Sequence, residues 1–116
     1  MPINYARMKQ RSDRLIRQNG TEYPVIRKGT VTITGGEEIH GEDVTFSAWG
    51  VKTEYHPDEI DGTAIQRGDV KMVFTSENVI EVGDLVTLDG RQHRVIKPGP
   101  VKPASLVLCY KAQLRA

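Results

Sequence analysis

The sequence predicts a mainly β fold: a small antiparallel β-barrel or sandwich of about six strands, preceded by one N-terminal α-helix. Hydrophobic residues follow a helical period only up to Gly20, and beyond it short runs alternate with a period of two. Turn residues separate these runs at the spacing typical of small barrels and sandwiches. The length of 116 residues suits one domain, so residues 1–116 are predicted to form a single domain.

Residues 4–19 are predicted to form an amphipathic helix. Asn4 is a suitable N-cap, and Asn19-Gly20 is expected to end the helix through a left-handed glycine. One apolar stripe consists of Tyr5, Met8, Leu15 and Ile16. The opposite face consists of Arg7, Arg11, Arg14 and Arg17. The apolar stripe must pack on something, and the arginine face is left for water or a partner.

Three strand candidates follow the helix. Thr21–Lys28 contains a proline, which favours a sheet edge, and Thr30–Thr34 alternates threonine with Val and Ile. The polar, glycine-rich segment Gly35–Asp43 is expected to be a hairpin loop. Asp43–Tyr55 is the longest candidate, and a change of parity beside Gly50 predicts a β-bulge there.

Residues 55–69 are predicted to form a long loop. They show little periodicity and are rich in Asp, Glu, Gly and Pro. A loop of this length in a small domain is often functional. The loop therefore joins the helix arginines as a candidate site for binding a partner.

Three further strand regions complete the chain, and no internal repeat is evident. Val70–Phe74 alternates as a strand. Asp89-Gly90 is typical of a two-residue type I′ hairpin turn, here between Leu85–Leu88 and Arg91–Ile96. Ser105–Arg115 is predicted to be the final strand.

No group of residues predicts catalysis or a metal site. No two histidines lie nearer than sixteen residues, and the single cysteine, Cys109, has no activating base in its local sequence. We expect His40 and His56 in exposed loops, His93 half-buried and hydrogen-bonded, and Cys109 as an inert packed thiol. The acidic residues of the long loop lack the ligand order of a calcium loop. The sequence thus predicts a non-enzymatic protein without catalytic residues, metal or cofactor.

The charge is unevenly distributed. The net charge is +1, but residues 1–20 hold five basic residues and one acidic residue, a balance of +4, which leaves −3 for the rest of the chain. A near-neutral chain argues against a dedicated nucleic-acid-binding protein. A basic helix on an acidic body is a steering pattern that can serve nucleic acid, a neighbouring subunit or solubility. No apolar run is long enough for a membrane helix, and the N-terminal residues lack the apolar segment of a signal peptide. A single cysteine is compatible with a reducing compartment.

Three stretches of the chain occur in an order typical of one protein family. The first comprises Tyr5-Ala6-Arg7, Arg14-Leu15-Ile16 and Asn19-Gly20; the second is Glu59–Asp69 followed by Val70–Phe74. The third comprises Val82-Gly83-Asp84, Asp89-Gly90, Arg94-Val95-Ile96 and Leu114-Arg115. In this order the chain resembles small neck proteins of tailed bacteriophages and prophages, that is, head-tail joining, head-closure or tail-attachment proteins. His93 departs from the aromatic residue expected at its position.

This resemblance implies a structural protein of the virion neck, present in the bacterial cytoplasm during assembly. Small β-barrel subunits would self-associate into a ring under the portal and join the DNA-filled head to the tail. The implied partners are the portal or adaptor ring and tail proteins, with non-specific contact to packaged DNA and no membrane. The candidate partner-binding residues are Arg7, Arg11, Arg14, Arg17, Tyr55, Asp58, Glu59, Ile60, Asp61, Gln66, Arg67 and Asp69.

Two other classes stay open. A solitary β-barrel module that binds nucleic acid predicts DNA or RNA affinity that falls steeply with salt. The neck protein instead predicts weak or no binding by the free monomer, because a near-neutral chain supplies few phosphate contacts. A small hydrolase predicts loss of activity when His93 or Asp61 is replaced.

Overall fold

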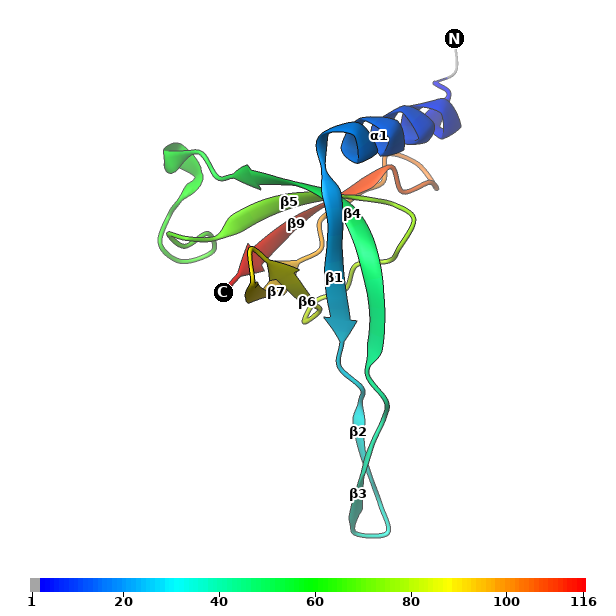
Figure 1. The fold of residues 1–116 in the computed structure, drawn as a ribbon, viewed down its shortest axis with the longest axis vertical. Coiled ribbons are helices and arrows are strands. Elements are labelled where there is room, and N and C mark those ends of the chain that lie inside the picture. The colour runs from blue at the N-terminus through cyan, green and yellow to red at the C-terminus, as the bar shows by residue number, and fades with distance from the viewer. Residues whose placement is uncertain (1–2) are drawn as a thin grey trace.

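The computed structural model describes residues 3–116, which form one helix, a closed β-barrel and a protruding β-hairpin (Figure 1). In chain order the elements are α1 (Tyr5–Asn19), β1 (Thr21–Arg27), β2 (Val31–Thr34), β3 (Glu37–His40), β4 (Val44–Glu54), the 3-10 turn η1 (Pro57–Glu59), β5 (Val70–Thr75), β6 (Leu85–Leu88), β7 (Arg91–Lys97), β8 (Pro100–Val101) and β9 (Cys109–Arg115). Residues 1 and 2 of the predicted single domain lie outside the described residues.

Six antiparallel strands close the barrel. Their order is β5-β4-β1-β6-β7-β9, and the pairing of β5 with β9 completes the ring, while β8 pairs with the first two residues of β9. The predicted mainly β fold with one N-terminal helix is confirmed, in its barrel form. The β1–β6 seam is narrow, because only Val25 with Val86 and Ile26 with Leu85 are paired across it.

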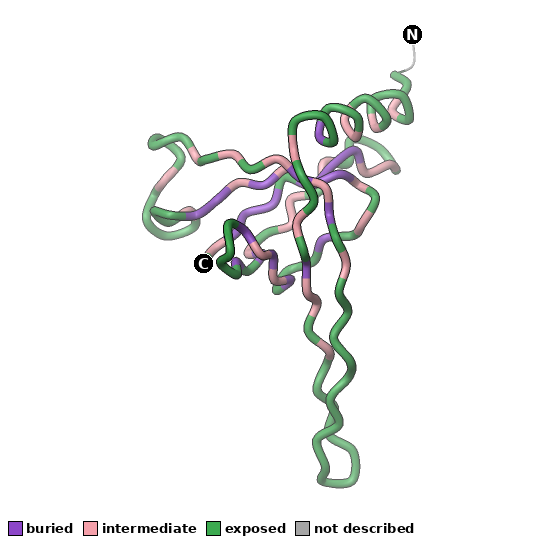
Figure 2. Tube along the Cα trace, viewed as in Figure 1, coloured by how far each residue is buried: buried purple, intermediate pink, exposed green. Residues whose placement is uncertain are grey.

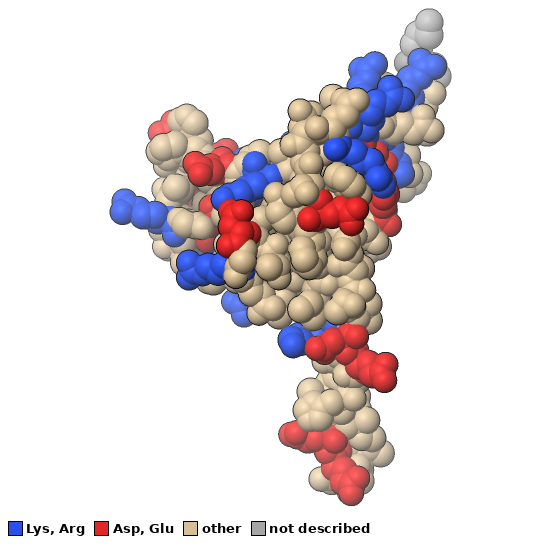
Figure 3. All heavy atoms as spheres, viewed as in Figure 1, with Lys and Arg blue, Asp and Glu red and all other residues tan. Residues whose placement is uncertain are grey.

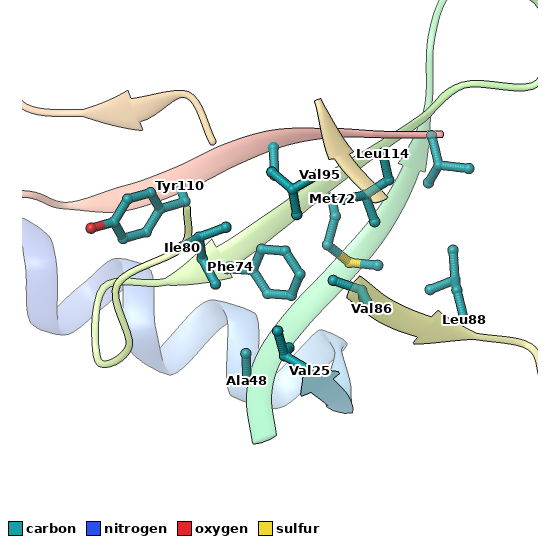
Figure 4. Packing of buried hydrophobic residues seen from close by; sticks show 12 residues of the cluster. Val25, Ala48, Met72, Phe74, Ile80, Val86, Leu88, Val95, Tyr110 and Leu114 are labelled. Atoms are coloured by element: carbon teal, nitrogen blue, oxygen red, sulfur yellow. The ribbon is translucent and has the colours of Figure 1, made fainter. Parts of the chain in front are cut away.

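The core fills the barrel interior (Figure 4). Alternate residues of each strand point inward, as the period of two predicts. The largest completely buried apolar side chains are Phe74, Met72, Leu88, Leu114, Val25, Val86 and Val95. Full burial of one such side chain contributes about 1.5–3 kcal/mol to folding. This set therefore makes the barrel the rigid part to which the other elements are attached.

Gly50 carries no bulge, so that prediction is wrong. The register is continuous through it, with Thr21 of β1 on one side and Phe74 of β5 on the other. A Cβ at Gly50 would lie 2.9 Å from Phe74 Cδ1 and 3.0 Å from Met72 Sδ. The glycine therefore makes room for core side chains where β4 passes from one partner strand to the next. The irregular register lies in β7 instead, between Val95 and Lys97.

The helix is capped as predicted at its start but not at its end. Asn4 Oδ1 accepts a hydrogen bond from the Arg7 backbone N–H at 3.1 Å. Gly20 is extended (φ −113°, ψ −162°) rather than left-handed. A Cβ at Gly20 would lie 2.0 Å from the carbonyl oxygen of Gly50. Glycine is required because the chain leaving the helix passes directly over β4.

The face of α1 that contacts β4, β5 and β9 differs in part from the predicted stripe. Ile16 is buried, and Tyr5, Lys9, Ser12 and Asp13 are half-buried. These positions recur every three or four residues and so form one face of the helix. Met8 and Leu15 were predicted to pack, but they are exposed on the flank of this face.

A second hairpin projects from the barrel, where a loop was predicted. Glu37–His40 is a strand paired with β2, and the turn is confined to Gly35-Gly36, both with positive φ. We call residues 28–43 the arm. Every residue of β2 and β3 is exposed (Figure 2). The arm extends β1 and β4 along the longest axis of the molecule, which measures 58 Å (Figure 1).

Two other strand predictions need correction and one is confirmed. Strand β1 is not at a sheet edge but between β4 and β6; Pro24 is tolerated because pairing with β6 begins only at Val25. The last strand begins at Cys109 rather than Ser105. The Asp89-Gly90 hairpin is confirmed, and both turn residues have positive φ, 52° and 77°.

Candidate interaction surfaces

Three of the four helix arginines lie together on the outer face of α1. Arg7, Arg11 and Arg14, with Gln10, line an open depression of about 300 Å³. Across residues 3–116, the side chains of these three arginines make no ion pair and no hydrogen bond. Figure 3 shows basic side chains gathered over the helix. The positive charge is therefore presented to solvent without an internal counter-charge.

Arg17 is held within the molecule. Its guanidinium donates hydrogen bonds to both carboxylate oxygens of Glu77 and lies 5.3 Å from the centre of the Trp49 ring. The hydrogen bond to Glu77 raises the pKa of Arg17. A bidentate pair over an aromatic ring fixes the guanidinium in one orientation. Arg17 thus links the end of α1 to the barrel, whereas the other three arginines make no such contact within the described part of the chain.

The predicted loop, residues 55–69, is fastened to the barrel by Asp69. The carboxylate of Asp69 accepts hydrogen bonds from Arg115 Nε at 3.0 Å, Arg115 Nη2 at 2.9 Å and Gln113 Nε2 at 2.8 Å. It also accepts one from the Gln66 backbone N–H at 2.9 Å. Gln113 Nε2 donates to the Ala64 carbonyl oxygen at 2.7 Å as well. Two residues of β9 therefore hold both the end and the middle of the loop.

The electrostatic consequence is a strongly acidic carboxyl group. The Arg115 hydrogen bonds, followed by those from Gln66 and Gln113, outweigh burial and lower the pKa of Asp69 to about 2. Its side chain is 1% exposed. A carboxylate that accepts several hydrogen bonds remains ionised far below the normal range. Asp69 therefore serves as a structural anchor, because its buried carboxylate accepts hydrogen bonds from the loop and from β9.

Asp61 orders the loop tip. Its Oδ1 accepts hydrogen bonds from the backbone N–H groups of Thr63 at 2.9 Å and Ile65 at 3.0 Å. The bond from Ile65, followed by that from Thr63, lowers the pKa of Asp61. The role of Asp61 is thus local, because its oxygen satisfies backbone donors of its own turn.

Four of the remaining predicted loop residues line two open depressions, Tyr55 and Ile60 in one and Gln66 and Arg67 in the other. One, of about 370 Å³, is lined by Lys52, Glu54, Tyr55, Ile60, Gly68, Asp69 and Val70. The other, of about 340 Å³, is lined by Gln66, Arg67, Gly68, Asp69, Arg91, Arg115 and Ala116. Lys71 lies 5.0 Å from the Tyr55 ring centre and 3.6 Å from a Glu59 oxygen. Asp58 is almost fully exposed. The loop and α1 lie apart from each other (Figure 1).

The Asp69 turn has a twin that the sequence analysis missed. Asp84 accepts a hydrogen bond from the Glu81 backbone N–H at 2.9 Å, as Asp69 does from Gln66. Each aspartate follows a glycine with φ 91° and precedes a strand. Each also accepts hydrogen bonds from Nε and Nη2 of one arginine, which is Arg27 in the case of Asp84. The signal was an Ile-x-x-Gly-Asp pattern that recurs fifteen residues later, at 65–69 and 80–84.

The histidines and the cysteine lie apart from these surfaces. His93 is 8% exposed and its Nδ1 lies 3.0 Å from the Arg91 carbonyl oxygen, close to the expected environment. His40 is exposed but in β3 rather than in a loop, and His56 is exposed as expected. Cys109 is buried, and burial raises the pKa of its thiol. Within residues 3–116, no three His, Cys, Asp or Glu side chains cluster as metal ligands would.

The arm is a candidate surface that the sequence analysis did not identify. It carries exposed Val31, Ile33 and Ile39 together with four carboxylates, at Glu37, Glu38, Glu42 and Asp43. The pattern that could have revealed it is a Gly-Gly turn between two short alternating runs. Among the described residues, no helix is long and apolar enough to span a membrane.

Neither a family model, nor a curated protein sequence, nor a solved structure matches this chain significantly. The geometry of the three surfaces is therefore the main guide to function.

Proposed function

We propose that this chain is a structural neck protein of a tailed bacteriophage or prophage. It joins the DNA-filled head to the tail by forming a ring through protein–protein contacts, in the virion neck and, during assembly, in the bacterial cytoplasm. The observation that carries the proposal is the arm, a two-stranded hairpin exposed along its whole length on a closed barrel.

An exposed two-stranded hairpin is only marginally stable by itself in water. Here it also exposes large apolar side chains, with Ile33 74% exposed. Such an element gains stability when a partner covers it, so its natural setting is an assembly. A protein that acts alone would gain nothing from this cost.

The loop and helix offer further contact surfaces of different character. The loop is held in place by Gln113 and Arg115, so it presents a preformed surface rather than one that must order on binding. The exposed arginines of α1 supply charge that guides a partner or contacts packaged DNA. We assign the loop to the portal or adaptor ring and tail proteins.

The resemblance of the sequence to neck proteins agrees with this geometry. The Glu59–Asp69 stretch on which the resemblance rests forms the tethered loop, and Val82-Gly83-Asp84 forms its twin turn. Both turns are places where the chain is bound to the barrel through an arginine. The residues typical of the family thus maintain the scaffold that presents the surfaces.

The test is deletion of the gene in the phage or prophage that encodes it, followed by electron microscopy of the lysate. The expected result is an accumulation of separate filled heads and complete tails, restored to joined particles by the wild-type gene in trans. Particles of normal appearance without the gene would remove the proposed role.

A second function, a nucleic-acid-binding β-barrel module, is favoured by one observation: three arginines that make no ion pair within residues 3–116 lie around one depression. A gel shift with duplex and single-stranded DNA distinguishes the two. Tight binding by the free monomer that weakens steeply between 50 and 200 mM salt, as is typical of phosphate contacts, supports the module. The neck protein is expected to bind weakly at about 150 mM salt.

A further inference from the structure

One face of the arm combines apolar and acidic side chains. Residues directly opposite each other in an antiparallel pair lie on the same face. The register pairs Val31 with His40 and Ile33 with Glu38, so these four side chains share a face. Val31 and Ile33 are 55% and 74% exposed. A partner surface complementary to this face would carry apolar side chains to cover Val31 and Ile33 and a positive charge to pair with Glu38.

The flank of α1 has the complementary composition. Met8 and Leu15 are 45% and 51% exposed. Arg11 comes three residues after Met8 and four before Leu15, so its side chain lies beside both. Met8 and Leu15 thus form an apolar strip beside a guanidinium that makes no ion pair among residues 3–116.

The overall charges of the two elements also match. The arm contains one lysine and four carboxylates, which gives −3 with neutral His40. On the helix, Lys9 pairs with Asp13 and Arg17 with Glu77, which leaves Arg7, Arg11 and Arg14. Charges of opposite sign accelerate association and fix the register of two surfaces.

The two apolar pairs are both short. Val31 and Ile33 lie about 7 Å apart at the rise of a β-strand. Met8 and Leu15 lie about 10 Å apart along the helix axis. The two elements lie at opposite ends of a molecule 58 Å long, so they cannot meet within one chain (Figure 3).

We propose that the arm of one copy docks on the helix of the next copy of this chain. Val31 and Ile33 cover Met8 and Leu15, while Glu38 pairs with Arg11. The proposal rests on the proposed function and specifies how the ring is built. Two different surfaces at opposite ends make a heterologous, head-to-tail contact, the kind that generates a closed ring when the rotation between subunits is suitable.

The first experiment uses disulfide trapping. Leu15→Cys and Ile33→Cys are introduced together, and particles purified from phage carrying this gene are oxidised and run on a non-reducing gel. A ladder of linked subunits up to the full ring is expected. The matched control pairs Leu15→Cys with Gln92→Cys on the exposed part of β7 and should yield monomers only.

The second experiment tests the charge pair. Arg11→Glu alone and Glu38→Arg alone should each reduce the trapped ladder at least tenfold, whereas the two reversals together should restore it. Lys97→Glu, an exposed reversal on β7, is the control and should leave the ladder unchanged.

The outcomes separate the two proposals. Joined particles that contain the double cysteine variant but give no ladder overturn the arm–helix contact and leave the neck function intact. A gene deletion that leaves particles normal overturns the function itself. A ladder limited to dimers would indicate a symmetric contact and would also overturn the head-to-tail arrangement.

Discussion

Arg115 grips Asp69 with two parallel hydrogen bonds, Nε to Oδ1 at 3.0 Å and Nη2 to Oδ2 at 2.9 Å. The same arrangement recurs between Arg27 and Asp84, with both bonds at 2.9 Å. Each arginine also donates from Nη2 to a carbonyl oxygen of the segment before its aspartate. Two arginines thus attach two connecting segments to the barrel. Arg115 holds the candidate binding loop, and Arg27 holds the segment before β6, next to the narrow β1–β6 seam.

Asp69→Asn should lower stability at neutral pH by about 1–2 kcal/mol, because the ionised pair with partly exposed Arg115 is lost. The folded pKa of about 2 is below the value of about 3.9 expected in the unfolded chain. The stabilisation by ionised Asp69 is therefore complete above about pH 4 and is lost as the pH falls towards 2. Urea unfolding between pH 2 and 7 measures it.

The control for this prediction is Asp58→Asn, at an almost fully exposed carboxylate of the same loop. It should leave the stability unchanged at pH 7. The Asp69→Asn substitution should also flatten the acid limb of the stability curve relative to wild type. An acid limb identical in both proteins would show that Asp69 is not ionised preferentially in the folded state.

Gly20→Ala should loosen α1 from the barrel. A Cβ there would lie 2.0 Å from a backbone oxygen that cannot rotate away. Because α1 contacts β9, where buried Cys109 lies, displacement of the helix should expose the thiol. The rate of thiol labelling, measured well below the melting temperature, should rise at least tenfold. Gly36→Ala at the distant arm tip is the control and should not change it.

The sequence predicted correctly those elements that depend only on neighbouring residues in the chain. Asp89-Gly90 could be recognised because a type I′ turn needs positive φ at both positions, and both have it. Gly20 and Gly50 could not be interpreted correctly, since each is required by an atom far away in the sequence. The period of α1 was visible, but the inward face includes Lys9, Ser12 and Asp13, which polarity alone places outside.

The candidate site was predictable to a lesser degree. The loop and the helix arginines were identified, yet the sequence could not show that Arg17 is bound to Glu77 or that Asp69 faces Arg115. Ion-pair partners sixty or forty-six residues apart leave no local pattern. The arm was missed because glycines and carboxylates lowered the apparent β-propensity of Glu37–His40, a segment that pairing with β2 nonetheless holds extended.

Substitution of the helix arginines should affect the melting temperature differently for Arg17 than for the other three. Arg7→Gln, Arg11→Gln and Arg14→Gln combined should leave the melting temperature unchanged, because their side chains have no internal partner among residues 3–116. Arg17→Gln should lower it slightly, because the contacts with Glu77 and Trp49 disappear. Under the proposed function the triple variant also prevents phage heads from joining to tails. Electron microscopy of the lysate measures this as separate heads and tails. Full infectivity of that variant would exclude these arginines from assembly.

Arg27→Gln should destabilise the protein by about 3 kcal/mol, because it leaves the buried carboxylate of Asp84 without its counter-charge. Asp84 is 1% exposed, and Arg27 is its only cationic hydrogen-bond partner among residues 3–116. Adding Asp84→Asn to Arg27→Gln removes the orphaned charge but keeps an oxygen that can accept from the Glu81 N–H. The double variant should therefore be more stable than Arg27→Gln alone. A double-mutant cycle based on free energies of unfolding from chemical denaturation measures the sign of this coupling. If the changes in free energy of unfolding caused by the two substitutions simply add, the Arg27–Asp84 pair contributes through packing rather than through charge.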